Sequence, residues 1–229
     1  MSDLAEHYSA FYAARAAERV YPVEFVVRAY LGHYPRLPND RGGYAGTRVL
    51  DVGFGDGRNL PLLADLGMAV HGVEIAEEIC AQTRSRMARL GVAAELRVGR
   101  NRALPFPDGF FDHLLACHAC YYVDPGFSFA DNVREMARVM RPGGRLVFSA
   151  PIGSSYILRG AHDLGDGHAT IVSDPYGVRA GTIMRKFDSE EQITAAIGDW
   201  FTDLRIGACR NDFWGIDEHV WIVVCHRRE

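Results

Sequence analysis

The stretch VLDVGFGDGRN at residues 49–59 decides the fold of this 229-residue chain. It starts as a short apolar run interrupted by Asp51, and glycines then follow at positions 53, 55 and 57. A glycine-rich turn between a strand and a helix lets the backbone approach a ligand closely. The stretch therefore predicts a strand over residues 48–52, a ligand-binding turn and a short helix over residues 58–66.

Spacing and charge in this turn favour S-adenosylmethionine over a dinucleotide. The dinucleotide fingerprint needs glycine or alanine at the sixth position, where this chain has Arg58. A pyrophosphate at a helix N-terminus needs N–H donors and no nearby acid, yet Asp51 and Asp56 flank the turn. S-adenosylmethionine has no phosphate and carries a sulfonium and an ammonium. Glu74, about 20 residues further on, is placed to accept ribose hydroxyls in either class of ligand.

Strand and helix patterns alternate on both sides of this turn. The order predicts right-handed crossovers and a parallel, doubly wound sheet covered on both faces. Two late strands joined around Gly215 are expected to be antiparallel. The expected strands are 48–52, 69–73, 94–98, 111–117, 145–149, 201–210 and 219–226, and the expected helices between them are 58–66, 76–90, 127–140 and 189–197.

The length fits one domain with a full core. We expect an N-terminal helical cap over residues 1–46, with helical runs at 4–17 and 22–34 and a linker at 35–46. A donor-binding core over 47–150 follows. A lid insertion without clear periodicity occupies 151–188, and a C-terminal helix and strand pair occupy 189–229.

Composition argues against several classes of protein. The net charge of −4 and pI near 6.1 lack the basic surplus that phosphate backbones require, so no nucleic-acid partner is expected. No run reaches the roughly 18 apolar residues of a membrane span, and the polar start does not resemble a signal peptide. The five scattered cysteines indicate reduced thiols in a cytoplasm. A monomer or homodimer is expected. The histidines and aspartates at 162–168 match no metal signature, so no metal is predicted.

These features resemble the class I S-adenosylmethionine-dependent methyltransferases, in particular the small-molecule branch. The resemblance covers about residues 47–149 and rests on four elements in order: 49–57, Glu74, LPFPDGFFD at 104–112 and RPGG at 141–144. It implies a Rossmann-like, doubly wound sheet of seven strands with an antiparallel last strand, N-terminal helices and a lid insertion.

The resemblance also assigns the donor site. The methionine part would lie against the glycine loop, Glu74 would hold the ribose, and Ile75 would pack on the adenine. Cys117 and His118, after the fourth strand, would face the transferred methyl. The implied cofactor-binding residues are Asp51, Gly53, Phe54, Gly55, Glu74, Ile75, Asn101 and Cys117.

One departure from the family concerns the adenine. Family members commonly have Gly-Asp before the Leu-Pro-Phe run, whereas this chain reads Gly99-Arg100-Asn101-Arg102. An arginine side chain has no hydrogen-bond acceptor, so Arg100 does not replace the acid. Either the amide oxygen of Asn101 or backbone groups would accept from the adenine amino group.

Segments outside the core pattern must supply the acceptor pocket. Tyr8, Tyr12, Tyr121 and Tyr122 are candidates, with ordinary aromatic packing as the alternative. His118 is the best candidate for a catalytic base if the acceptor is a hydroxyl. Methyl transfer otherwise depends mainly on positioning, because the sulfonium is already activated.

We therefore expect an enzyme that methylates an oxygen, nitrogen or carbon of a small metabolite. A protein or nucleic acid methyltransferase is one alternative. The Asn-Pro-Pro-Tyr type of motif seen in many amino-group nucleic acid methylases is absent, because residues 117–120 read CHAC. A non-catalytic regulator that binds the donor is the other alternative.

Overall fold

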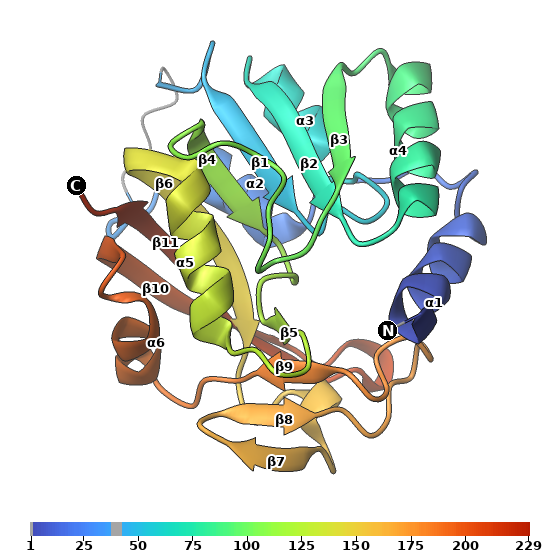
Figure 1. Ribbon diagram of the computed structural model, residues 1–229, viewed down its shortest axis with the longest axis vertical. Helices are drawn as coiled ribbons and strands as arrows, with labels where there is room; N and C mark the ends of the chain where they lie inside the picture. Colours follow the sequence, from blue (N-terminus) through green and yellow to red (C-terminus); the bar gives the residue numbers. More distant parts are fainter. Residues whose placement is uncertain (1, 38–42) are drawn as a thin grey trace.

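The computed structural model describes residues 2–37 and 43–229, so part of the expected linker at 35–46 lies outside the described residues. A seven-stranded sheet in the order β3-β2-β1-β4-β6-β11-β10 forms its centre (Figure 1). The strands are β1 Arg48–Val52, β2 Ala69–Glu74, β3 Ala94–Val98, β4 Phe111–Ala116, β6 Met140–Pro151, β10 Phe201–Asn211 and β11 Glu218–Arg227.

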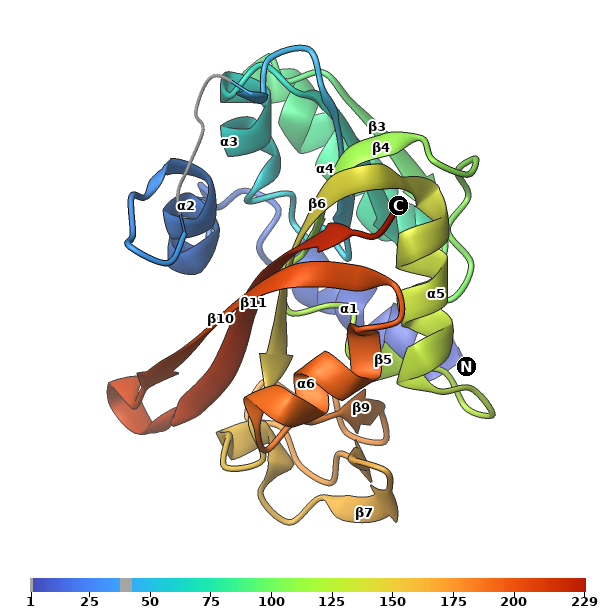
Figure 2. The same cartoon turned by 90° about the vertical axis from the view of Figure 1, so that its left-hand side faces the viewer.

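Strand directions confirm the predicted sheet. β1 is parallel to β2 and β4, and the outer pairs β2–β3 and β4–β6 are parallel too. The last strand, β11, is inserted between β6 and β10 and is antiparallel to both. The hairpin of β10 and β11 extends well beyond the rest of the sheet (Figure 2).

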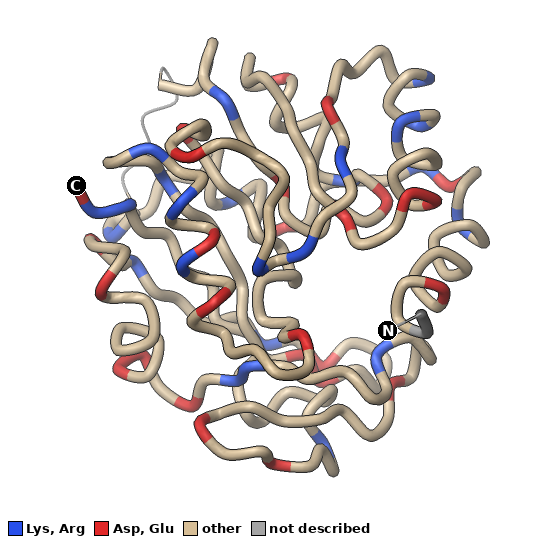
Figure 3. Tube along the Cα trace, viewed as in Figure 1, with Lys and Arg blue, Asp and Glu red and all other residues tan. Residues whose placement is uncertain are grey.

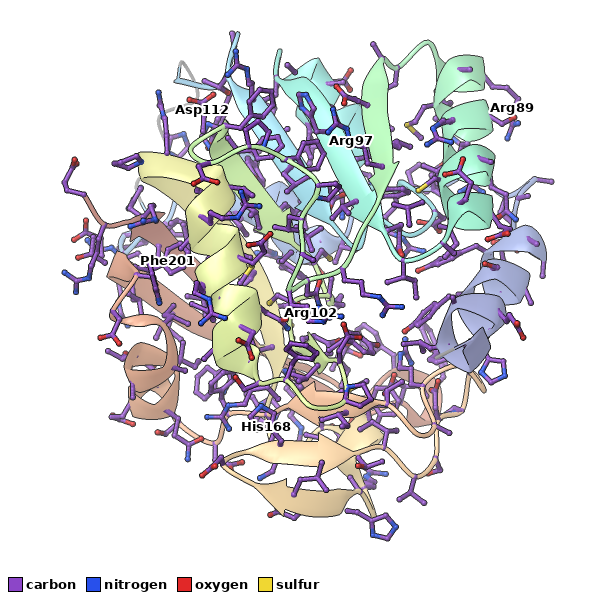
Figure 4. The ribbon with its side chains drawn as sticks, viewed as in Figure 1. Arg89, Arg97, Arg102, Asp112, His168 and Phe201 are labelled. Atoms are coloured by element: carbon purple, nitrogen blue, oxygen red, sulfur yellow. The ribbon has the colours of Figure 1, made fainter. Side chains whose placement is uncertain are left out.

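Helices cover both faces, as the alternation predicted. α2 (Glu24–Leu31), α3 (Leu60–Asp65) and α4 (Glu77–Leu90) contribute to one apolar cluster, and α5 (Phe129–Val139) and α6 (Glu190–Ile197) contribute to the other. The side chains of β1 alternate between them, because successive residues of a strand point to opposite faces: Val49 joins the first cluster and Leu50 the second. Phe201, fully buried at the start of β10, packs in the second cluster (Figure 4).

Two N-terminal helices are shorter than the sequence predicted. α1 spans Ser2–Ala13 rather than 4–17, and α2 ends at Leu31 rather than at residue 34. Beyond α1 the backbone carbonyls bind the side chain of Arg86 instead of continuing the helix. Arg86 Nη2 donates to the carbonyls of Arg15 at 2.8 Å and Ala16 at 3.2 Å. A contact from α4 therefore holds this stretch as a turn, which helical periodicity alone does not reveal.

The expected lid contains regular structure that the sequence analysis missed. β7 (His162–Gly165), β8 (His168–Thr170) and β9 (Ile183–Arg185) form a second sheet with β5 (Tyr122–Val123), in the order β5-β9-β8-β7. The strands are short and β7 is exposed throughout, so no alternation marks it. The signal present was Asp166-Gly167, a pair typical of two-residue hairpin turns, and both residues have positive φ.

The arrows of β1 to β4 point towards the small sheet and α1 (Figure 1). The carboxyl edge of a parallel sheet is where ligands bind in open α/β folds. None of the helices among the described residues combines the length and the apolar character needed to cross a membrane.

Candidate active site

The turn after β1 requires glycine for two separate reasons. Gly53 and Gly55 have φ values of +67° and +55°, in the left-handed region that side chains disfavour. A Cβ at Gly53 would lie 2.5 Å from the Cβ of Ala119, and one at Gly55 would lie 2.3 Å from the hydroxyl oxygen of Tyr12. The loop is therefore in close contact with the segment after β4 and with α1.

Asp51 occupies the most unusual position in the site. Its side chain is fully buried, and neither carboxylate oxygen makes a hydrogen bond within the described residues. Burial raises its pKa well above the ordinary value, and the nearby charge of Glu74 raises it further. The Asn59 side chain lies close enough to lower the pKa, although it does not meet the geometry of a hydrogen bond to the carboxylate. Burying a carboxylate without a partner lowers the free energy of unfolding by several kcal/mol, a large part of the total stability of a typical domain. Its presence indicates a cationic or N–H-donating ligand.

Glu74 ends β2, next to β1 in the sheet. Its Oε1 accepts the Gly55 N–H at 3.0 Å, and its Oε2 accepts the Ile75 N–H at 2.8 Å. Burial raises its pKa, and the two backbone hydrogen bonds oppose that rise. Each carboxylate oxygen can accept a second hydrogen bond, so Glu74 can brace the loop and still bind a diol.

The structure corrects our argument from Asp56. Its carboxylate pairs with Arg58 in two contacts, at 3.1 Å to Nε and 2.8 Å to Nη2. That pairing neutralises the charge which we expected to repel a pyrophosphate. Asp51 and Glu74 therefore carry the electrostatic argument.

Two cavities adjoin the loop. One of about 340 Å³ is lined by Glu74, Ile75 and Asn101, and one of about 680 Å³ is lined by Asp56, Cys117 and Phe54. The wall common to both comprises Tyr8, Tyr12, Gly53, His118 and Tyr122. The cavities thus bring together the four expected acceptor tyrosines and most of the expected donor residues, whereas Asp51 and Gly55 line neither cavity.

Asn101 and Arg100 behave differently at the rim of the smaller cavity. The Asn101 Nδ2 donates to the carbonyls of Ala119 at 2.9 Å and Tyr122 at 3.1 Å. Among the described residues its amide oxygen makes no hydrogen bond, so the atom suggested for adenine is available. Arg100 pairs with Asp124 at 2.9 Å, as does Arg102, which comes from the same loop (Figure 4).

His118 follows β4 with a left-handed φ of 55°. The Ser149 hydroxyl fixes it, accepting the His118 N–H at 2.9 Å and lying 3.3 Å from Nδ1. The Nε2 atom has no hydrogen bond within the described residues. Burial lowers the pKa of the imidazole, the charge of Glu218 opposes this, and Arg179 and Arg58 lower the pKa further. The ring is therefore neutral at pH 7, as a base must be.

The four tyrosines predicted from the sequence lie together. Tyr8 and Tyr122 share a hydroxyl–hydroxyl hydrogen bond of 2.8 Å. Tyr8 stacks on Tyr12 with ring centroids 5.9 Å apart, and Tyr121 stacks on Tyr122 at 4.9 Å. Burial raises the pKa values of Tyr8, Tyr12 and Tyr121, so their hydroxyls stay protonated.

Sequence reasoning missed several residues of the site. Arg179 donates from Nε to the Tyr122 hydroxyl at 3.2 Å. Asn132, on α5, donates to the carbonyls of Cys120 and Tyr122 at 2.9 and 2.8 Å and so holds the loop after β4. Ser149 and Glu218 flank His118. None carries a local motif. Within the part of the chain that the structure describes, which includes the histidines and aspartates at 162–168, no group of three or more metal-ligating side chains is found.

Comparisons with known proteins agree with this geometry. A methyltransferase domain model matches residues 50–148. The chain is 33% identical over 164 residues to a demethylmenaquinone methyltransferase from Tropheryma whipplei, covering 69% of this chain and 61% of that protein. It is 39% identical over 111 residues to a phosphatidylethanolamine N-methyltransferase from Cereibacter sphaeroides, covering 48% and 51%. The chain thus spans between half and about three fifths of the length of these relatives.

A solved structure with a similar fold is also a methyltransferase. An S-adenosylmethionine-dependent methyltransferase from Methanosarcina mazei superposes with a TM-score of 0.66 at 18% identity, covering 91% of this chain and 99% of that one. The chain belongs to the class I S-adenosylmethionine-dependent methyltransferases. S-adenosylmethionine is the cofactor of this family, and the unpartnered carboxylate of Asp51 fits the cationic groups that this molecule carries.

We infer that Asp51 binds the ammonium of the donor, and its substitution tests this. The raised pKa means that the folded protein without donor loses stability as pH rises above the unfolded value of about 4. Asp51→Asn removes that cost. It should stabilise the donor-free protein by on the order of 1 kcal/mol at pH 7 and by less at pH 4, as measured by urea denaturation.

The same variant should lose the thermal stabilisation that S-adenosylhomocysteine gives the wild type. Asp65→Asn, an exposed charge on α3, serves as the control and should change neither property. A variant Asp51→Asn that binds the ligand as the wild type does would contradict the assignment.

Proposed function

We propose that the protein transfers the methyl group of S-adenosylmethionine to a small molecule held in the larger cavity. The observation that carries this is the wall shared by the two cavities. It places the glycine loop, with Glu74 and the unpartnered Asp51 beside it, next to His118 and a group of tyrosines. When bound, the donor supplies an electrophilic methyl group on its sulfonium. The protein has to position an acceptor against that carbon and exclude water.

The donor would span the smaller cavity and the part of the larger cavity that adjoins the glycine loop, which Phe54 and Cys117 line. Asp51 would hold the ammonium, Glu74 the ribose hydroxyls, and the Asn101 amide oxygen the adenine amino group. Ile75 would pack against the adenine. The rest of the proposed methionine site comprises Gly53, Phe54, Gly55 and Cys117.

A small acceptor fits the chain better than a nucleic acid. Lysine and arginine are interspersed with acids along the trace in the view of Figure 3, and the net charge is −4. Phosphate backbones require concentrated positive charge. The relatives above are named for methylation of demethylmenaquinone and of phosphatidylethanolamine. We place the protein in the cytoplasm as a monomer or homodimer, with residues 1–46 and 151–188 as the cap and lid of the site.

The donor step is tested by calorimetry. S-adenosylmethionine and S-adenosylhomocysteine should bind, and NAD should not. Glu74→Ala should weaken binding by about 1–3 kcal/mol, the usual cost of losing hydrogen bonds to a buried charged group. Glu77→Ala, an exposed residue on α4 paired with Arg84, should leave it unchanged. Preferential NAD binding would refute the assignment.

The acceptor class is tested by following S-adenosylhomocysteine formation with metabolites, peptides and oligonucleotides in parallel. Turnover confined to small metabolites is the expected result. Turnover of peptides or oligonucleotides alone would identify one of the alternative enzymes, and donor binding without any turnover would identify a regulator.

We propose that His118 accepts the proton when the acceptor is a hydroxyl. His118→Ala should then lower turnover by about 10²–10⁴ while donor affinity is retained. Because burial lowers the imidazole pKa, the wild-type rate should rise with pH below about 6.5 and stay level above it, and the variant should lack that rise.

Measurements of initial rate between pH 4.5 and 8 decide this. Ser149→Ala is the matched second variant, since it frees Nδ1 without removing the ring, and it should shift the limb rather than abolish it. A near-normal rate in His118→Ala would exclude His118 as the base.

A further inference from the structure

We propose that the acceptor carries a carboxylate or phosphate group, which Arg179 and the hydroxyls of Tyr156 and Tyr8 bind in the larger cavity. This inference rests on the proposed function, because it names the substrate class of the same site. Arg179, Tyr156 and Tyr8 all line that cavity, and the Arg179 side chain is only 23% exposed.

A buried carboxylate fixes the position of the guanidinium. The side chain of Asp174 is completely buried. Its Oδ1 accepts hydrogen bonds from Arg179 Nη1 at 3.0 Å and from the Tyr176 N–H at 3.1 Å. Its Oδ2 accepts the N–H groups of Val178 and Arg179, each at 3.1 Å. The loop thus saturates Asp174 with backbone donors and uses the remaining lone pair to orient Arg179.

The direction of the hydrogen bonds made by Arg179 leaves tyrosine hydroxyl hydrogens available as donors in the cavity. Arg179 donates to the hydroxyl oxygens of Tyr122 at 3.2 Å and Tyr156 at 3.3 Å, because a guanidinium has no acceptor. The Tyr156 hydrogen is therefore directed elsewhere. The Tyr122 hydrogen is free to donate to Tyr8 at 2.8 Å, which passes the surplus donor to the Tyr8 hydroxyl.

The guanidinium itself keeps unused donors. Within the described residues Arg179 Nη2 makes no hydrogen bond, although the side chain is mostly buried. The two N–H groups of Arg179 Nη2 and the hydroxyls of Tyr156 and Tyr8 thus belong to side chains that line one cavity, and these donors are not used up by the contacts of Arg179. A group that only accepts hydrogen bonds satisfies all of them. Although Asp174 already pairs with Nη1, an anionic acceptor makes the stronger, charge-assisted hydrogen bonds with the remaining N–H groups of the guanidinium. Burial removes the Tyr8 and Tyr156 hydroxyls from water, which strengthens their electrostatic attraction to an anion.

A negative charge in the same cavity restricts where such a group can lie. Glu218 lines the same cavity and is held by Asn211 Nδ2 at 3.3 Å. Its negative charge would repel an anion, so the anion belongs at the Arg179 side. An oxygen whose lone pairs are engaged by a guanidinium is a poor nucleophile, so this group anchors the acceptor while another of its atoms receives the methyl.

The test uses the 229-residue protein saturated with S-adenosylhomocysteine and three probes: benzoate, phenyl phosphate and the neutral benzamide. Calorimetry should show that one or both anions bind more tightly than benzamide, and the better anion distinguishes carboxylate from phosphate. Arg179→Gln should weaken anion binding by about 10- to 100-fold and leave benzamide unchanged. Arg159→Gln, an exposed arginine paired with Asp217, is the control and should bind the probes as the wild type does.

Equal binding of benzoate, phenyl phosphate and benzamide to the wild type would overturn the proposal, as would unchanged anion affinity in Arg179→Gln. If Arg179→Gln does not fold, Tyr156→Phe decides: weaker anion binding supports the site, and unchanged binding overturns it. The preceding titration with S-adenosylhomocysteine stands apart, because its failure would count against the proposed function, and the probes can then be titrated into the donor-free protein.

Discussion

The buried carboxylate of Asp51 is the constraint on which the rest of the site depends. It lies on the fourth residue of β1, where the alternation of the strand directs its side chain to the same face as Val49. Without a ligand the protein holds an unpartnered acid next to a second buried acid, Glu74, and both have raised pKa values. The burial of the two apolar clusters against the seven-stranded sheet offsets the free-energy cost of this arrangement.

The site is completed by parts of the chain that are distant in sequence. α1 supplies Tyr8 and Tyr12, the turn after β4 supplies His118, β5 supplies Tyr122, and the segment before β9 supplies Arg179. One hydrogen-bonded chain from Tyr8 through Tyr122 to Arg179 joins all three. Donor and acceptor would thus meet at a wall whose polar groups form a single hydrogen-bonded network. A substitution at one end of this network would therefore alter the hydrogen bonds at the other end.

Residues with local signals were predictable from the sequence. The glycine loop, the position of Glu74 and the order of the strands follow from periodicity and spacing. Among the four tyrosines, Tyr8 and Tyr12 come from a segment outside the core pattern, whereas Tyr121 and Tyr122 follow the fourth predicted strand.

Residues defined by tertiary contacts were not predictable in this way. The pairing of Asp56 with Arg58 depends on the turn geometry, and the end of α1 depends on Arg86 reaching from α4. Arg179 lies in a segment without periodicity, and only its contacts with Asp174 and the tyrosines reveal its role. The strands β7 to β9 have only three or four residues each, too few for a recognisable alternation, and β7 is exposed throughout. The Asp166-Gly167 pair nevertheless marked the turn between two of them.

Carboxyl ¹³C NMR titration of Asp51, assigned by comparison with Asp51→Asn, tests the central claim most directly. In the donor-free protein the resonance should titrate well above the ordinary value of about 4. In the complex with S-adenosylhomocysteine, which carries the ammonium but no sulfonium, the pKa should fall because the cation favours the charged carboxylate. An ordinary pKa in the free protein, or a raised pKa that does not change when the ligand binds, would contradict the account.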